Sequence, residues 1–158
     1  MRAGTAMTGH MGLELNLLTE PQADLDQLKT AIALHKEHRA LIHNGNFQRL
    51  DTPDYLNIVG VVAADRSEAI WSVAFLSGHA ATLPDRFTPT GLNPAARYRI
   101  NIIWPTDWRS ISGPSVVDAL DLVGEGADVS GEALMTAGMQ LPLTVPQTVL
   151  ILYLQAVL

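Results

Sequence analysis

The chain has 158 residues, of which 47% are hydrophobic, and it carries a formal net charge of -6 with a pI near 5.2. This length fits one domain, or one domain with an appendage, and the apolar content argues against wholesale disorder. The negative charge disfavours binding to nucleic acid or to an anionic membrane surface, because both require basic faces. The chain has no cysteine, which excludes disulfides, zinc–thiolate sites and cysteine nucleophiles.

The two ends of the chain indicate the compartment that we expect. The first residues contain one arginine and then small and polar residues, without the apolar core of a signal peptide. The most apolar run, residues 149–158 (VLILYLQAVL), is too short to span a bilayer, which needs about 20 residues. We therefore expect a soluble, cytoplasmic protein with no membrane partner.

The strongest local pattern predicts a helix over residues 20–43. Thr19 is a suitable N-cap, Gln22 stands three residues later as its capping-box partner, and Pro21 falls in the first turn. The pair Asn44-Gly45 is expected to end the helix in a left-handed conformation. A stripe at helical spacing must be buried against something, and it consists of Leu25, Leu28, Ile32, His35, Arg39 and Ile42.

After Gly45 the pattern changes to short β-type runs separated by Gly, Pro, Asn and Asp. Residues 56–64 and 68–76 predict a hairpin, and the alternation from Tyr98 onward predicts a half-buried strand whose apolar side is closed by Trp104. Further strand candidates are residues 47–50, 86–88, 116–122 and 148–156, whereas residues 130–137 fit either a helical turn or a strand. We expect a mainly β fold, with an antiparallel β-sandwich over residues 45–158 preceded by a separate segment, residues 1–44.

Five segments of the chain, in order, resemble the C-terminal end of bacterial α-galactosidases (melibiases) of glycoside hydrolase family 36: GHMGLELNLL, IALHKEHRALIHNG, RLDTPD, GLNPAARYRI and SGEALMTAGMQLP. Enzymes of that family have an N-terminal β-sandwich, a central (β/α)8 barrel and a small C-terminal antiparallel β-domain. The resemblance implies that residues 1–44 are the last strand, loop and helix of the barrel. It also implies a partner, the missing catalytic barrel, through which alone an α-galactoside substrate would be bound.

The resemblance does not bring the catalytic groups with it. Retaining glycosidases need a nucleophilic carboxylate and an acid/base carboxyl group about 5–5.5 Å apart. In the family these groups lie on barrel strands, in a Lys-x-Asp stretch and after a segment with Cys and Arg. This chain has neither motif, since Lys29 and Lys36 are followed by other residues and cysteine is absent. We expect no catalytic residue, and a structural chain that is inactive alone within an enzyme hydrolysing terminal α-galactosyl groups.

One alternative function is a carbohydrate-binding module that uses an exposed tryptophan. Trp71 and Trp104 stand in apolar strands and are expected in the core. Trp108, in the sequence PTDWR, is the candidate exposed ring, because flat aromatic faces suit pyranose rings. We therefore take Trp108 as a candidate substrate-binding residue.

Histidines provide the other candidates. His10, in the turn GHMG, would lie beside the active-site face of a (β/α)8 barrel, so it is a second candidate for substrate binding, although a structural hydrogen bond is favoured. A metal-binding protein is a further alternative, since His35, His38 and His43 crowd the end of the helix. Their spacing is not His-Glu-x-x-His, and we assign no metal ligand and expect no cofactor. The apolar helix stripe is expected to drive self-association into a homo-oligomer or docking onto the sandwich.

Overall fold

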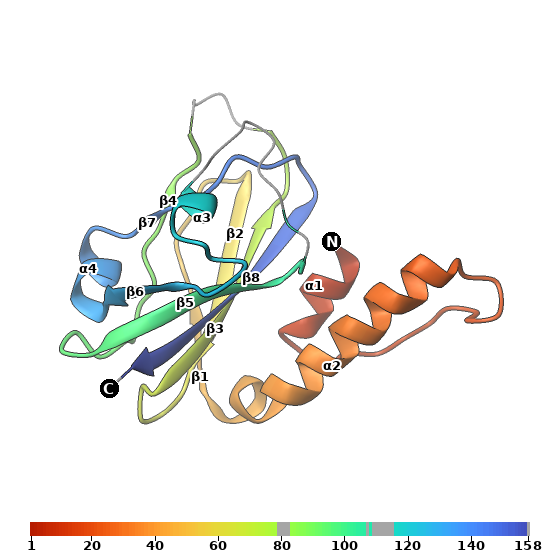
Figure 1. Cartoon of the computed structure of the whole chain (residues 1–158), viewed down its shortest axis with the longest axis horizontal. Coiled ribbons are helices and arrows are strands. Elements are labelled where there is room, and N and C mark those ends of the chain that lie inside the picture. Colours follow the sequence, from red (N-terminus) through yellow and green to blue (C-terminus); the bar gives the residue numbers. More distant parts are fainter. Residues whose placement is uncertain (79–82, 107, 109–115, 158) are drawn as a thin grey trace.

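The computed structural model describes residues 1–78, 83–106, 108 and 116–157. Within these residues the elements are α1 (Arg2–Met7), α2 (Gln22–Asn44), β1 (Asn46–Arg49), β2 (Leu56–Val62), β3 (Glu68–Phe75), β4 (Arg86–Phe87), β5 (Arg97–Trp104), α3 (Val116–Ala119), β6 (Ala127–Ser130), α4 (Gly131–Thr136), β7 (Met139–Gln140) and β8 (Thr148–Val157). A six-stranded antiparallel sheet has the order β1-β2-β3-β8-β5-β6, and β4 pairs with β7 in a second, two-stranded sheet (Figure 1). None of the helices in these ranges is long and apolar enough to cross a membrane.

The predicted hairpin is confirmed. β2 and β3 pair in antiparallel register from Leu56 opposite Phe75 to Val62 opposite Ala69. In the turn, the Asp65 carboxylate accepts hydrogen bonds from the backbone and the hydroxyl of Ser67, at 2.9 and 2.6 Å. These bonds lower the pKa of Asp65 below its usual value. The last strand of the chain, β8, then inserts between β3 and β5, so the middle of the sheet is formed by strands far apart in sequence.

Each face of the large sheet carries its own apolar core. One face, with Trp71 and Ile100 at its centre, is covered by β4, β7, α3, α4 and the segments between them. The other face, with Ile70 and Ile151, is covered by α1 and α2. The expected burial of Trp71 is confirmed, and Phe75, Tyr98, Ile100 and Ile102 share its core, all at 3% exposure or less.

The second layer of the β-domain is less regular than a sandwich requires. Besides the two-stranded sheet it consists of short helices and connections, so the antiparallel β-domain is confirmed but a full second sheet is absent from the described residues. Residues 116–122 were expected to form a strand, and this prediction is wrong. They form α3 and a turn that places Val117 and Leu122 in the core, with the Leu122 amide donating to the Val117 carbonyl at 2.9 Å.

A β-bulge moves Trp104 to the face that its alternation does not predict. Ile102 lies opposite Leu152, but Trp104 lies opposite Ile151, so one extra residue stands in β5 between the two pairs. Residues paired directly across two strands face the same side of the sheet, and an extra residue reverses the alternation. Trp104 is buried, as expected, but it packs beneath α1 and not beside Ile102.

The N-terminal segment differs from expectation in three respects. No strand lies in residues 1–45, and the expected last barrel strand is replaced by α1 and a loop. α1 can pack close to the sheet because Gly4, which has no side chain, lies against the Trp104 ring. Thr19 does not cap α2; its hydroxyl donates to the Asn16 carbonyl at 3.0 Å, and Pro21 stands at the cap. Gly45 is extended, not left-handed, and a Cβ there would overlap Val61 Cγ1.

Candidate functional site

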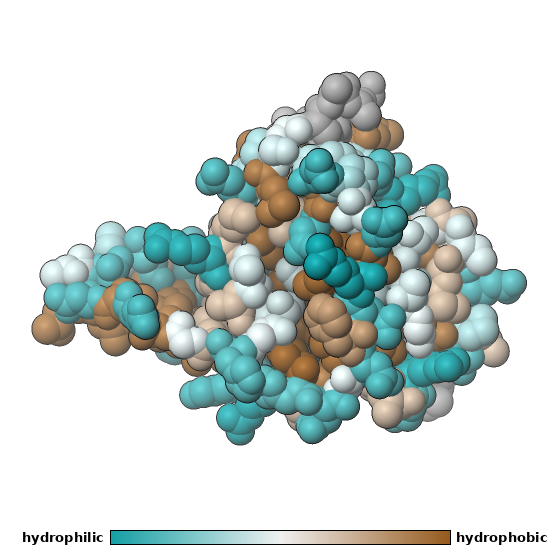
Figure 2. Space-filling model, turned by 180° about the vertical axis from the view of Figure 1, so that it is seen from behind, coloured by the Kyte–Doolittle hydropathy of each residue, from teal (hydrophilic) through white to brown (hydrophobic). Residues whose placement is uncertain are grey.

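The first half of α2 projects beyond the sheet, together with the loop that leads into it (Figure 1). Leu18 is 96% exposed and Leu17 is 51% exposed. An open groove of about 380 Å³ lies here, and its lining includes Leu13, Leu17, Leu25, Leu28 and Ile32, which we call the α2 apolar face. Hydrophobic surface is visible along this projecting end in Figure 2. A surface this apolar is typical of a protein contact, because single domains seldom leave such a patch to water.

A second hollow, of about 590 Å³, lies between α1, the loop and α2. Its lining includes the apolar side chains of Met11 and Trp104 and shares Leu13, Leu25 and Leu28 with the α2 apolar face. Its charged residues are Arg2, Glu14, Glu20 and Asp24. The two hollows share these leucines and therefore form one continuous strip, and Lys29 and Lys36 are the charged residues that line the first.

His10 lies in a group of three histidines near the C-terminal end of α2. Its ring stacks on that of His43, with the centroids 4.7 Å apart, and His43 meets His35 edge to face at 6.0 Å. His35 Nδ1 lies 3.0 Å from the Met7 carbonyl oxygen and ties α2 to the end of α1. Among the described residues, no group of three or more His, Asp or Glu side chains could hold a metal ion. Substrate binding by His10 stays a prediction.

The expectation that Trp108 is exposed is wrong. The side chain is 7% exposed and belongs to the same core as Trp71, Val117 and Leu122. The neighbouring residues 107 and 109 lie outside the described residues. A ring buried to this degree offers little face to a sugar, and a sugar contact at Trp108 stays a prediction.

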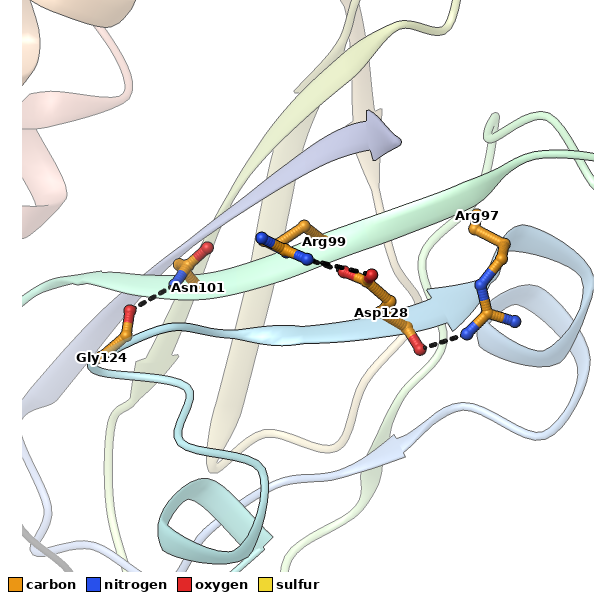
Figure 3. A network of polar contacts seen from close by, with 5 residues as sticks. All are labelled: Arg97, Arg99, Asn101, Gly124 and Asp128. Carbon is orange, nitrogen blue, oxygen red and sulfur yellow. Dashed lines mark hydrogen bonds and ion pairs between the residues drawn. The ribbon is translucent and has the colours of Figure 1, made fainter. Parts of the chain in front are cut away.

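A network of polar side chains joins β5 to β6, the edge strand of the large sheet (Figure 3). The Arg99 guanidinium donates to both carboxylate oxygens of Asp128, at 2.8 and 3.0 Å. Arg97 donates to the Asp128 carbonyl at 2.8 Å, and Asn101 donates to the Gly124 carbonyl at 3.0 Å. The hydrogen bond from Arg99 holds the pKa of Asp128 below its usual value. These bonds fasten the short edge strand, and sequence reasoning did not identify them.

A buried polar contact, also missed from the sequence, lies where α2 meets the sheet. His38 is 7% exposed, and its ring centroid is 4.5 Å from that of Tyr153 on β8. The Tyr153 hydroxyl donates to Glu68 Oε2 on β3 at 2.7 Å. Burial, followed by this hydrogen bond, raises the pKa of Tyr153 far above its usual value. The signal in the sequence was the helical spacing of His38 with Ala31 and Leu41, which are buried on the same side of α2.

Comparison with known proteins identifies the family. A family model described as the glycosyl hydrolase family 36 C-terminal domain matches residues 57–154. The chain belongs to this family. An α-galactosidase from Escherichia coli is 32% identical over 169 residues, which include 98% of this chain and 22% of the relative. α-Galactosidase AgaA from Geobacillus stearothermophilus is 35% identical over 71 residues, or 44% of this chain and 10% of that relative.

Solved α-galactosidase structures are similar over almost all of this chain. The α-galactosidase from Lactobacillus brevis superposes with a TM-score of 0.77 at 27% identity, covering 99% of this chain and 20% of that one. A form of AgaA in complex with raffinose superposes with a TM-score of 0.78 at 26% identity, covering 99% of this chain and 19% of that one. This family 36 chain therefore corresponds to the C-terminal part of α-galactosidases and spans about one fifth of their length.

Proposed function

We propose that this chain is the C-terminal region of an α-galactosidase that hydrolyses terminal α-galactosyl groups of oligosaccharides with retention of configuration. Its own role is structural, and it is inactive alone. One observation carries the proposal: almost the whole chain aligns with α-galactosidases, yet it accounts for only about one fifth of each. The sequence contains no Lys-x-Asp stretch, so the carboxyl pair of a retaining mechanism has to come from another part of the enzyme.

The α2 apolar face supports a contact with that other part. We propose that residues 1–44 pack with the catalytic barrel and that residues 45–158 form the C-terminal domain. The half-exposed strip around Leu25 and Leu28 then becomes an internal surface, and its charged lining residues remain at the rim. Burying a fully exposed leucine contributes roughly 1.5–3 kcal/mol, and the half-buried ones contribute less. The α-galactoside substrate is bound by the barrel alone. A cytoplasmic location stays a prediction.

The activity of the purified chain tests the proposal. Residues 1–158 should not hydrolyse an aryl α-galactoside above background at any pH, because acid/base catalysis, the nucleophile and the sugar pocket are all absent. Loss of acid/base catalysis alone removes about 10²–10⁴-fold of rate. Turnover that persists after a second purification column would refute the structural role.

A replacement experiment tests the role within an enzyme. In the E. coli relative, the segment that aligns with this chain is deleted, or is exchanged for residues 1–158. We expect the deletion to lower solubility and thermal stability, and the exchange to restore them together with turnover. A truncated enzyme that is as stable and as active as the intact one would contradict the proposal.

A further inference from the structure

One imidazole is buried where α2 packs on the sheet. His38 packs on Tyr153 of β8, and the Tyr153 hydroxyl is held by Glu68 of β3. Nearby apolar residues of α2, Leu41 and Ile42, are buried in the same core. The imidazole therefore lies inside the contact that fastens α2 to the sheet.

Few charges face this imidazole from the elements packed around it. β2 has no titratable side chain, β3 has only Glu68, and β8 has only Tyr153. On α2 itself the charge that acts on the ring is Glu37; Arg39 beside it is exposed, and His35, one turn earlier, is held against the Met7 carbonyl. The single charge of α1, Arg2, lines the hollow beside Glu20 and Asp24, at the other end of α2. Two carboxylates thus favour a proton on the ring, and burial opposes it.

Burial has the larger effect. It lowers the pKa of His38 below its ordinary value, against the raising effect of Glu37 and then Glu68. A charged imidazole must give up most of its hydration to remain in the contact, whereas the neutral ring packs there at little cost. An undocked helix exposes the ring to water, where it titrates at about 6.5.

We propose that His38 is a pH-sensitive latch, and that proton uptake by its imidazole releases α2 from the face of the six-stranded sheet that α1 and α2 cover. The undocked state binds the proton more readily than the docked state. Docking of α2 is therefore strongest above about pH 6.5 and weakens as the pH falls below it. One proton changes the docking equilibrium by at most about tenfold per pH unit.

Hydrogen exchange on the 158-residue chain tests the latch. Amide protection factors of residues 31–42, each corrected for the intrinsic exchange rate of that amide at that pH, are measured at pH 7.5 and 5.5. We expect these protection factors to fall by roughly three- to tenfold at the lower pH. His38→Gln should abolish the fall, and His43→Gln, on the exposed end of the same helix, should retain it.

A second variant and a second measurement sharpen the test. Glu68→Gln removes one carboxylate that favours the charged ring and keeps an acceptor for Tyr153, so it should enlarge the fall. In the wild-type chain, the NMR titration of the His38 ring and the shifts of the α2 amides should share one midpoint. Equal protection at both pH values, an unchanged fall in His38→Gln, or two separate midpoints would each overturn the latch.

Discussion

Trp104 lies opposite Ile151 across β5 and β8, on the face of the sheet that α1 covers, although Ile102 faces the other core. The Cβ that a side chain would add at Gly4 lies 3.1 Å from the Trp104 ring, so α1 can sit there only with a very small residue at that position. The bulge in β5 thus supplies the surface on which the first helix rests.

Gly4→Leu should therefore detach α1 from the sheet. The added side chain would have to displace Trp104 or Val149, both of them buried. We expect residues 5–7, whose amides are hydrogen-bonded in α1, to lose their hydrogen-exchange protection while the sheet keeps its own. Thr5→Leu, at an exposed position of the same helix, is the matched control and should leave α1 docked. Retained protection in Gly4→Leu would show that α1 does not depend on this contact.

Gly60→Ala should destabilise the domain strongly. A Cβ at this position in β2 would overlap the Trp71 ring and would lie 2.8 Å from the Ile70 carbonyl oxygen. Overpacking of this kind costs about 1–3 kcal/mol or more. Gly78→Ala, where the added Cβ meets nothing within 4 Å, should change the free energy of unfolding very little. Urea denaturation of the two variants measures the difference, and equal midpoints would contradict the close approach.

Ile100→Asp should unfold the β-domain. The side chain is 0% exposed at the centre of the larger core, so the new carboxylate would be buried without a partner at a cost of several kcal/mol. Gln155→Asp, at an exposed position on the neighbouring strand, is the control and should remain folded. Circular dichroism and thermal melting compare them, and a normal melting transition in Ile100→Asp would refute the burial.

Arg99→Gln should raise the pKa of Asp128 toward its ordinary value. The Arg99 hydrogen bonds depress that pKa, so the pair stabilises the fold above about pH 4 and loses its effect as the pH falls through the folded-state value. NMR titration of the Asp128 carboxyl carbon in both proteins measures the change. Arg97→Gln should have less effect, because Arg97 bonds the Asp128 carbonyl and not its carboxylate.

The α2 apolar face should make the isolated chain self-associate. Complete burial of an exposed leucine contributes roughly 1.5–3 kcal/mol, so Leu13 and Leu17, about half exposed, and the partly buried Leu25, Leu28 and Ile32 each contribute part of that. Light scattering should show dimers or larger species, and the double variant Leu17→Ser with Leu28→Ser should shift the chain toward monomer. Ala40→Ser, on an exposed part of the same helix, should not. A strict monomer whose residues 20–43 exchange freely with solvent would count against this role of the face.

The sequence by itself determined the elements whose pattern repeats within a short window. The hairpin of β2 and β3, the strand β8 and the extent of α2 follow from alternation and from helical spacing, because these depend on neighbouring residues. Five ordered segments were also sufficient to indicate the family, which the match over residues 57–154 confirms.

Only the tertiary structure decided features that depend on residues far apart in the chain. The bulge before Trp104 exists in the pairing with β8, about 50 residues later, and cannot be read from β5 alone. Trp108 is buried because distant apolar residues such as Leu122 surround it, although its own neighbours are polar. The surroundings of His38 are also decided by the tertiary structure, since Glu68 and Tyr153 come from two strands that meet α2 only in the assembled sheet. Local patterns specify backbone preference, but which partners meet is set by the packing of the whole core.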